Sequence, residues 1–172
     1  MTESASNEFP RMFDVRQCEG KQASLVANEA ERAALARRFG LVRIDRLEAD
    51  MLLSRKGREV DAAGTLTADI VQSCAVSAAD LPVSIREELA FRFVPEDTRQ
   101  ISEEEIELDA DACDEIEYSG THFDLGEAVA QSLALAIDPF ATGPEADVAR
   151  ARPEMNNAED GGPFSALKNL KL

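Results

Sequence analysis

The chain has 172 residues, of which 44% are hydrophobic, 30% are charged and 5% are aromatic, with no tryptophan. This length suits one folded domain with tails, and the composition excludes both a disordered chain and a membrane-spanning one, since no apolar run approaches about 18 residues. The formal net charge of −16 argues against a nucleic-acid backbone as the main partner and favours a basic one.

The negative charge is concentrated in one part of the chain. Residues 1–93 carry 15 acidic and 13 basic side chains, whereas residues 94–160 carry 19 acidic and 3 basic ones. Within the first part, residues 32–58 are locally positive. The chain therefore has two electrically distinct regions, and each is a candidate binding surface.

The N-terminal part is expected to contain a tail, a strand and a helix. Residues 1–11 are predicted to be a tail, and a strand is expected around residues 13–18. The helix begins after Asn28, which can cap it, while Glu31 three positions later completes a capping box. Gly40 suits the left-handed conformation of the residue that follows a helix.

Apolar and polar residues then alternate over three consecutive segments, residues 46–54, 58–76 and 82–95. A period of two predicts strands that bury one face. Gly57 is expected at the tip of the first hairpin, and Gly64 is expected to mark a bulge or a bend. Short connections favour an antiparallel meander, because parallel neighbours need long crossovers. The pattern leaves open whether this sheet closes into a barrel.

An acidic segment, residues 94–117, follows the third strand and is predicted to be a loop that partly joins the sheet edge. A second helix is expected after it. Asp124 can cap this helix, Glu127 can complete a capping box, and Pro139 must end it. The predicted fold class is therefore α+β, an antiparallel meander sheet with two main helices.

The folded domain is expected to span residues 12–140. Residues 141–162 have few apolar side chains to pack and are predicted to be a flexible polar linker. In residues 163–172, apolar side chains recur at helical spacing, which predicts a short amphipathic helix, the C-terminal hook. The apolar residues of the hook are Phe164, Leu167 and Leu170. The pattern leaves open whether the hook packs on its own domain or on a partner.

Side chains that could support catalysis or bind a metal are few and scattered. Cys18, Cys74 and Cys113 form no C-x-x-C pair, and His122 is the only histidine, so neither a structural zinc site nor a catalytic triad can be assembled. The chain has no glycine-rich phosphate loop, and its acidic run does not follow the calcium-loop pattern. We therefore expect no enzymatic activity, metal or cofactor. The lack of a signal-peptide pattern predicts a cytoplasmic location.

The order of motifs resembles the YceD family, which is named for accumulation of the large-subunit ribosomal RNA. The resemblance rests on VQSCAVSAADLPVSIREELAFRFVP, on FDLGEAVAQSLALAIDP and on the terminal PFSALKNLK, and it covers roughly residues 11–172. Many relatives carry C-x-x-C where this chain has Cys74 and Ser77, and further cysteines after the late helix, so no metal or redox role is expected here. The resemblance implies a role in production or maturation of the large ribosomal subunit.

Two binding hypotheses follow from the two charged regions. In the first, the acidic segment binds a basic ribosomal protein or an assembly factor, the hook adds an apolar anchor, and contact with RNA is indirect. Its candidate residues are Glu103, Glu104, Glu105, Glu107, Asp109, Asp111, Asp114 and Glu115. In the second, the positive region binds RNA directly. Its candidate residues are Arg37, Arg38, Arg43, Arg46, Arg55, Lys56 and Arg58. A third possibility, a processing enzyme, would need a divalent ion held by Asp109, Asp111, Asp114 or Glu115.

Overall fold

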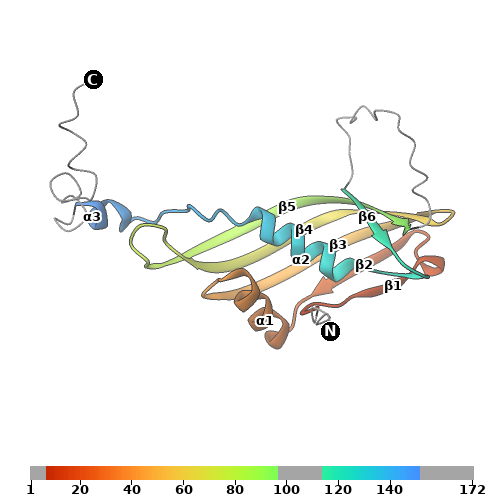
Figure 1. Ribbon diagram of the computed structural model, residues 1–172, viewed down its shortest axis with the longest axis horizontal. Coiled ribbons are helices and arrows are strands. Elements are labelled where there is room, and N and C mark those ends of the chain that lie inside the picture. Colours follow the sequence, from red (N-terminus) through yellow and green to blue (C-terminus); the bar gives the residue numbers. More distant parts are fainter. Residues whose placement is uncertain (1–6, 97–113, 152–172) are drawn as a thin grey trace, which may run out of the picture.

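The alternating segments form the centre of a five-stranded sheet. In the computed structural model, which describes residues 7–96 and 114–151, the strand order is β2-β3-β4-β5-β6 (Figure 1). The strands are β2 (Lys21–Val26), β3 (Arg43–Lys56), β4 (Glu59–Ser73), β5 (Asp80–Pro95) and β6 (Asp114–Tyr118). Strands β2 to β5 are antiparallel, which confirms the predicted meander, whereas β6 is parallel to β5. Since β2 and β6 do not pair with each other in the described part, the sheet is open and is not a barrel.

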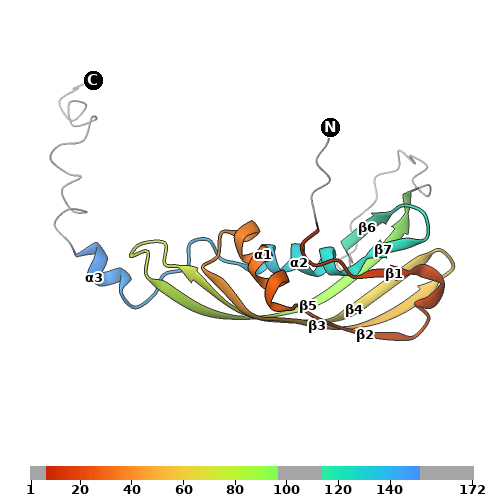
Figure 2. The same ribbon diagram turned by 90° about the horizontal axis from the view of Figure 1, so that it is seen from below.

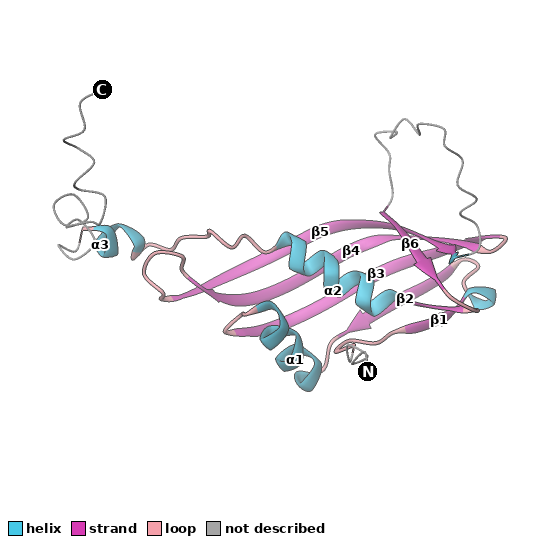
Figure 3. Cartoon of the chain, in the orientation of Figure 1, coloured by secondary structure: helices cyan, strands magenta, loops and turns pink. Residues whose placement is uncertain are grey.

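A second, small sheet and four helical segments complete the described fold, and Figure 3 shows how they are arranged. The small sheet pairs β1 (Met12–Asp14) with β7 (His122–Asp124), antiparallel. The helical segments are the 3₁₀ turn η1 (Val15–Gln17), α1 (Glu29–Phe39), α2 (Leu125–Ala136) and α3 (Ala146–Arg150). The strand expected around residues 13–18 is therefore cut short by η1, and β2 was not predicted. None of these helices is long and apolar enough to cross a membrane.

The two main helices begin at the capping residues that the sequence indicates. Asn28 accepts a hydrogen bond from the Glu31 N–H at 2.9 Å, and the Glu31 carboxylate accepts one from the Asn28 N–H at 2.8 Å, so the predicted capping box of α1 is confirmed. At α2, Asp124 accepts from the Glu127 N–H at 3.1 Å. The reciprocal half of that box is absent, because the Glu127 carboxylate binds Arg38 of α1 instead.

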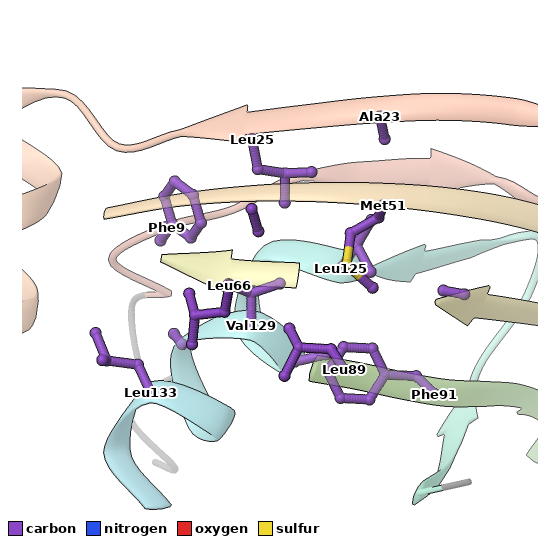
Figure 4. Close-up of a cluster of buried hydrophobic side chains, with 14 of the residues drawn as sticks. Phe9, Ala23, Leu25, Met51, Leu66, Leu89, Phe91, Leu125, Val129 and Leu133 are labelled. Atoms are coloured by element: carbon purple, nitrogen blue, oxygen red, sulfur yellow. The ribbon is translucent and has the colours of Figure 1, made fainter. Parts of the chain in front are cut away.

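Both main helices lie on one face of the five-stranded sheet, and no described helix covers the opposite face (Figure 2). The covered face carries the apolar members of the alternating pattern, and α2 contributes Leu125, Val129 and Leu133 to the same core (Figure 4). The buried strand residues that the alternation predicted are Leu47, Ala49, Met51, Leu53, Val60, Ala62, Leu66, Ala68, Ile70, Ile85, Leu89, Phe91 and Phe93. The period of two thus identified the covered face correctly.

Phe9 also belongs to this core, although the sequence places it in a tail. Its side chain is 0% exposed and lies in the same hydrophobic cluster as those of α2 (Figure 4). Asp124 ties the segment to the start of α2, because its carboxylate accepts hydrogen bonds from the Asn7 side-chain amide and, at 2.9 Å, from the Arg11 N–H. The folded domain therefore begins before residue 12.

The predicted linker, residues 141–162, is folded in the part that the structure describes. The Gly143 N–H donates to Cys74 Sγ at 3.4 Å, which fixes this segment on the turn between β4 and β5. Helix α3 follows and buries two of its alanines. The folded structure therefore extends to residue 151. The rest of the predicted linker, residues 152–162, lies outside the described residues, and so does the hook, residues 163–172.

Gly64 does not mark a bulge. The β3–β4 register runs through it without a break and shifts only between Ile44 and Arg46. A Cβ atom at Gly64 would lie 2.0 Å from the Asp50 carbonyl oxygen of β3. The close approach of the two strands, rather than a register change, is what requires glycine at this position.

Candidate functional site

The pairing of β5 with β6 determines where the two ends of the predicted acidic segment lie. Phe91 pairs with Asp114 and Pro95 with Tyr118, so the connection leaves the C-terminal end of β5 and returns at the start of β6. Asp114 and Glu115 occupy the first two positions of β6, and both are exposed. The other acidic candidates, Glu103, Glu104, Glu105, Glu107, Asp109 and Asp111, lie outside the described residues. Both ends of the acidic segment are therefore held at one edge of the sheet.

The uncovered sheet face adds carboxylates that the sequence analysis missed. Asp50 of β3 and Glu88 of β5 flank Thr65 of β4 in one cross-strand row, so their backbones are about 10 Å apart. Both are exposed, and neither side chain forms a hydrogen bond or an ion pair with another described residue. Glu115 and Glu117 of β6 lie on the same face, because they pair with outward residues of β5. We call Asp50, Glu88, Glu115 and Glu117 the acidic face.

The seven positive candidates fall into two groups at opposite ends of β3. This strand has 14 residues and is therefore about 45 Å long. The first group, in α1 and at the start of β3, contains Arg37, Arg38, Arg43 and Arg46. The second group, around the β3–β4 turn, contains Arg55, Lys56 and Arg58. The structure therefore does not bring the seven side chains together in one surface.

Most of the first group is already paired within the protein. The Arg38 guanidinium donates to both oxygens of the Glu127 carboxylate, at 2.7 and 3.0 Å. It also donates to the Glu8 carboxylate at 3.0 Å. These bonds raise the pKa of Arg38 and lower that of Glu127. Arg43 and Arg46 pair with neighbouring aspartates at 2.9 Å. Arg37 is exposed and makes no side-chain contact of this kind with the described residues. The first group thus offers little unpaired positive charge.

The second group surrounds the β3–β4 turn, where Gly57 has φ +67° and is at the tip as predicted. The Lys56 ammonium pairs with Asp61 at 2.8 Å. Arg55 instead donates to two backbone carbonyls, that of Gly57 at 3.0 Å and that of Arg16 at 3.4 Å. The structure thus places Arg16, which the sequence analysis did not select, beside this group.

A comparison with protein-family models matches residues 62–171 to the family described as Large ribosomal RNA subunit accumulation protein YceD. The chain belongs to the YceD family. The matched range includes both motifs after residue 120 on which the resemblance rests, so that resemblance is confirmed. No curated protein and no solved structure matches the chain. The family description indicates a role in accumulation of the large ribosomal RNA subunit.

The matched region of this YceD-family protein contains one thiol with an unusual environment. Cys74 Sγ is buried and accepts hydrogen bonds from the N–H groups of Ser77 and Gly143, each at 3.4 Å. A hydrogen bond with the Ser77 side chain lowers the pKa of Cys74 most, and hydrogen bonds from backbone N–H groups lower it further, to about 6. At Cys18, by contrast, burial raises the pKa. Cys113 lies outside the described residues. In the described part of the chain, no three metal-ligating side chains gather into a cluster.

Proposed function

We propose that this YceD-family protein is a non-enzymatic factor that supports accumulation of the large ribosomal RNA subunit by binding a basic protein, either a ribosomal protein or an assembly factor. The observation that supports the proposal is the acidic face, Asp50, Glu88, Glu115 and Glu117, on the side of the sheet that no described helix covers. The acidic connection between β5 and β6 starts and ends beside it.

Charge provides the physical basis of this binding. Like charges gathered on one surface create a potential that speeds the encounter with an oppositely charged partner, most strongly at low ionic strength. Basic side chains on the same face weaken this potential in part. Lys56 and Arg92 both bind Asp61, and Arg46 binds Asp69. Arg86 of β5 is also exposed on this face. The protein would then influence the ribosomal RNA indirectly, through the basic partner that it holds.

The C-terminal hook is proposed to add an apolar anchor to this contact. Burying Phe164, Leu167 and Leu170 is worth about 4–8 kcal/mol before the ordering of the segment is subtracted, at about 1.5–3 kcal/mol for each side chain. This gain suffices for docking but not for tight binding by itself, so the charged contact is expected to determine the affinity.

The test uses the full chain and nuclease-treated ribosomal proteins of the large subunit, at low and at high salt. The double variant Glu88→Gln/Glu115→Gln removes two charges from the acidic face. The control Glu145→Gln/Asp147→Asn removes the same charge at α3, where both side chains are exposed. We expect the wild type and the control to retain basic proteins at low salt and the acidic-face variant to retain several-fold less. An equal loss in both variants, or recovery only while RNA is present, would contradict the proposal.

Direct RNA binding through all seven positive candidates has less support. The seven lie at two ends of a strand about 45 Å long, and several are paired with carboxylates of the protein itself. A loss of RNA affinity in Arg37→Gln/Arg43→Gln, with a shallower salt dependence, would favour this alternative.

A further inference from the structure

The end of the sheet at which β3 turns into β4 contains a pocket of about 290 Å³. Three arginines line it, Arg16 from η1 and Arg55 and Arg58 from the β3–β4 turn, together with Tyr118 and Thr121. Among residues 7–96 and 114–151, no acidic side chain lines this pocket, although the protein has a net charge of −16. We call this the arginine pocket.

The guanidinium of Arg55 is held in place within this pocket. Its Nε and Nη1 atoms donate to the carbonyls of Gly57 and Arg16, and the Arg55 side chain is only partly exposed. A guanidinium has five N–H donors, so three remain without a partner among the described residues. Because the group is already oriented, binding an anion would cost little side-chain entropy.

Arg16 adds a second donor group at the rim. Its side chain is exposed and forms no hydrogen bond or ion pair with another described residue. Two nearby carboxylates have other partners: Asp14 accepts from the Arg16 backbone N–H at 2.8 Å, and Glu96 accepts from the Ser119 hydroxyl at 2.5 Å. Tyr118 fixes the opposite wall, because its hydroxyl donates to the Arg58 carbonyl at 2.5 Å.

A second groove lined by arginines lies between α1 and the start of β3, and it differs from the arginine pocket because acidic side chains also line it. Its volume is about 480 Å³, and Arg32, Arg37 and Arg43 line it, but so do Glu29 and Asp45. Asp45 pairs with Arg43 at 2.9 Å. An anion entering that groove would meet two carboxylates, whereas none of the described residues that line the arginine pocket is acidic.

We propose that the arginine pocket binds a phosphate group. Arginine presents a planar fork of donors that matches phosphate oxygens and forms short, charge-assisted hydrogen bonds with them. The phosphodiester of an RNA strand and a free phosphate share this chemistry. The site is separate from the acidic face and does not depend on the proposed binding of a basic protein.

The experiment measures two ligands on the full chain at low salt: inorganic phosphate by calorimetry, and a fluorescently labelled single-stranded RNA oligonucleotide by anisotropy. Arg16→Gln removes one exposed donor group, and Arg55→Lys keeps the charge but loses the fork. Arg86→Gln is the control for charge. Arg86 is exposed on the uncovered face of β5, and it lines neither the arginine pocket nor the groove between α1 and β3. Equal urea midpoints for all four proteins establish that the variants are folded.

We expect Arg16→Gln and Arg55→Lys each to weaken binding by about tenfold or more, and Arg86→Gln to change it by less than about twofold. For RNA, Arg16→Gln should also reduce the slope of log K against log salt by ~0.7. Such losses with RNA identify the phosphodiester as the ligand, and losses with inorganic phosphate alone identify a free phosphate. The proposal is overturned if neither ligand binds, if the pocket variants bind as the wild type does, or if Arg86→Gln loses as much as Arg16→Gln.

Discussion

Replacing Phe9 with alanine is expected to destabilise the whole domain, because the N-terminal segment is part of the core. Phe9 is 0% exposed, and the Arg11 guanidinium lies 4.3 Å from the centre of its ring. The segment is further held by the Asp124 carboxylate, which also caps α2. The substitution therefore affects the contact between the N-terminal segment, the sheet and α2 together.

The magnitude follows from the buried ring. Truncating a buried phenylalanine to alanine costs about 3–5 kcal/mol, because transfer free energy is lost and a cavity remains. The lost cation–π contact with Arg11 adds about 0.5–1 kcal/mol at a partly exposed site. We therefore expect a decrease of about 5 kcal/mol in the free energy of unfolding, which corresponds to about 10–20 °C in Tm for a domain of this size.

The assay is urea unfolding followed by circular dichroism, with Phe140→Ala as the matched control. Phe140 is 79% exposed, so the same substitution there should change the stability by less than about 0.5 kcal/mol. If Phe9→Ala costs less than about 1 kcal/mol, or no more than Phe140→Ala, then Phe9 does not anchor the core and the domain begins later in the chain.

Three further predictions concern single contacts. A Cβ at Gly126 would lie 1.9 Å from the Phe9 carbonyl oxygen, so Gly126→Ala should lower the unfolding free energy by about 1–3 kcal/mol despite the better helix propensity of alanine, and a gain in stability would contradict this packing. Arg38 lowers the pKa of Glu127, so this ion pair stabilises the fold above the ordinary glutamate pKa of about 4.3 and the contribution is lost as the pH falls through the lower folded-state pKa. Glu127→Gln should therefore cost about 1 kcal/mol at neutral pH and progressively less in acid, whereas a cost independent of pH would argue against the ion pair. In a variant that keeps Cys74 as its sole cysteine, the alkylation rate should rise through a pH of about 6, and a midpoint near the ordinary thiol value would show that the N–H groups do not stabilise the thiolate.

Local rules predicted the elements that depend on neighbours in the sequence. The alternation in residues 46–54, 58–76 and 82–95 identified β3, β4 and β5 and the face that each buries. Asn28 and Asp124 marked the helix starts, because a cap acts within one turn of its own helix. These signals are short-range, so one sequence suffices to read them.

The errors occurred where a short segment depends on distant partners. Strand β2 has six residues and only two buried apolar side chains before Ala27, so its pattern is weak until β3 pairs with it. Phe9 is buried by elements far away in the chain, and Gly143 is fixed by Cys74 Sγ and the turn around it. The carboxylate of Glu127 was predicted to cap its own helix, but Arg38 of α1 offers a stronger, charge-assisted bond.

The candidate binding surfaces show the same difference between what neighbouring residues indicate and what distant partners decide. The sequence by itself determined that negative charge follows the third long strand and that a positive region precedes it, since charge is counted along the chain. Only the tertiary structure decided which charges gather. Strand β3 holds its two ends about 45 Å apart and so divides the predicted positive cluster. The same fold brings Arg16 to Arg55, 39 positions later, and places Asp50 beside Glu88 across one intervening strand, because side-chain proximity in a sheet is set by register and not by position in the sequence.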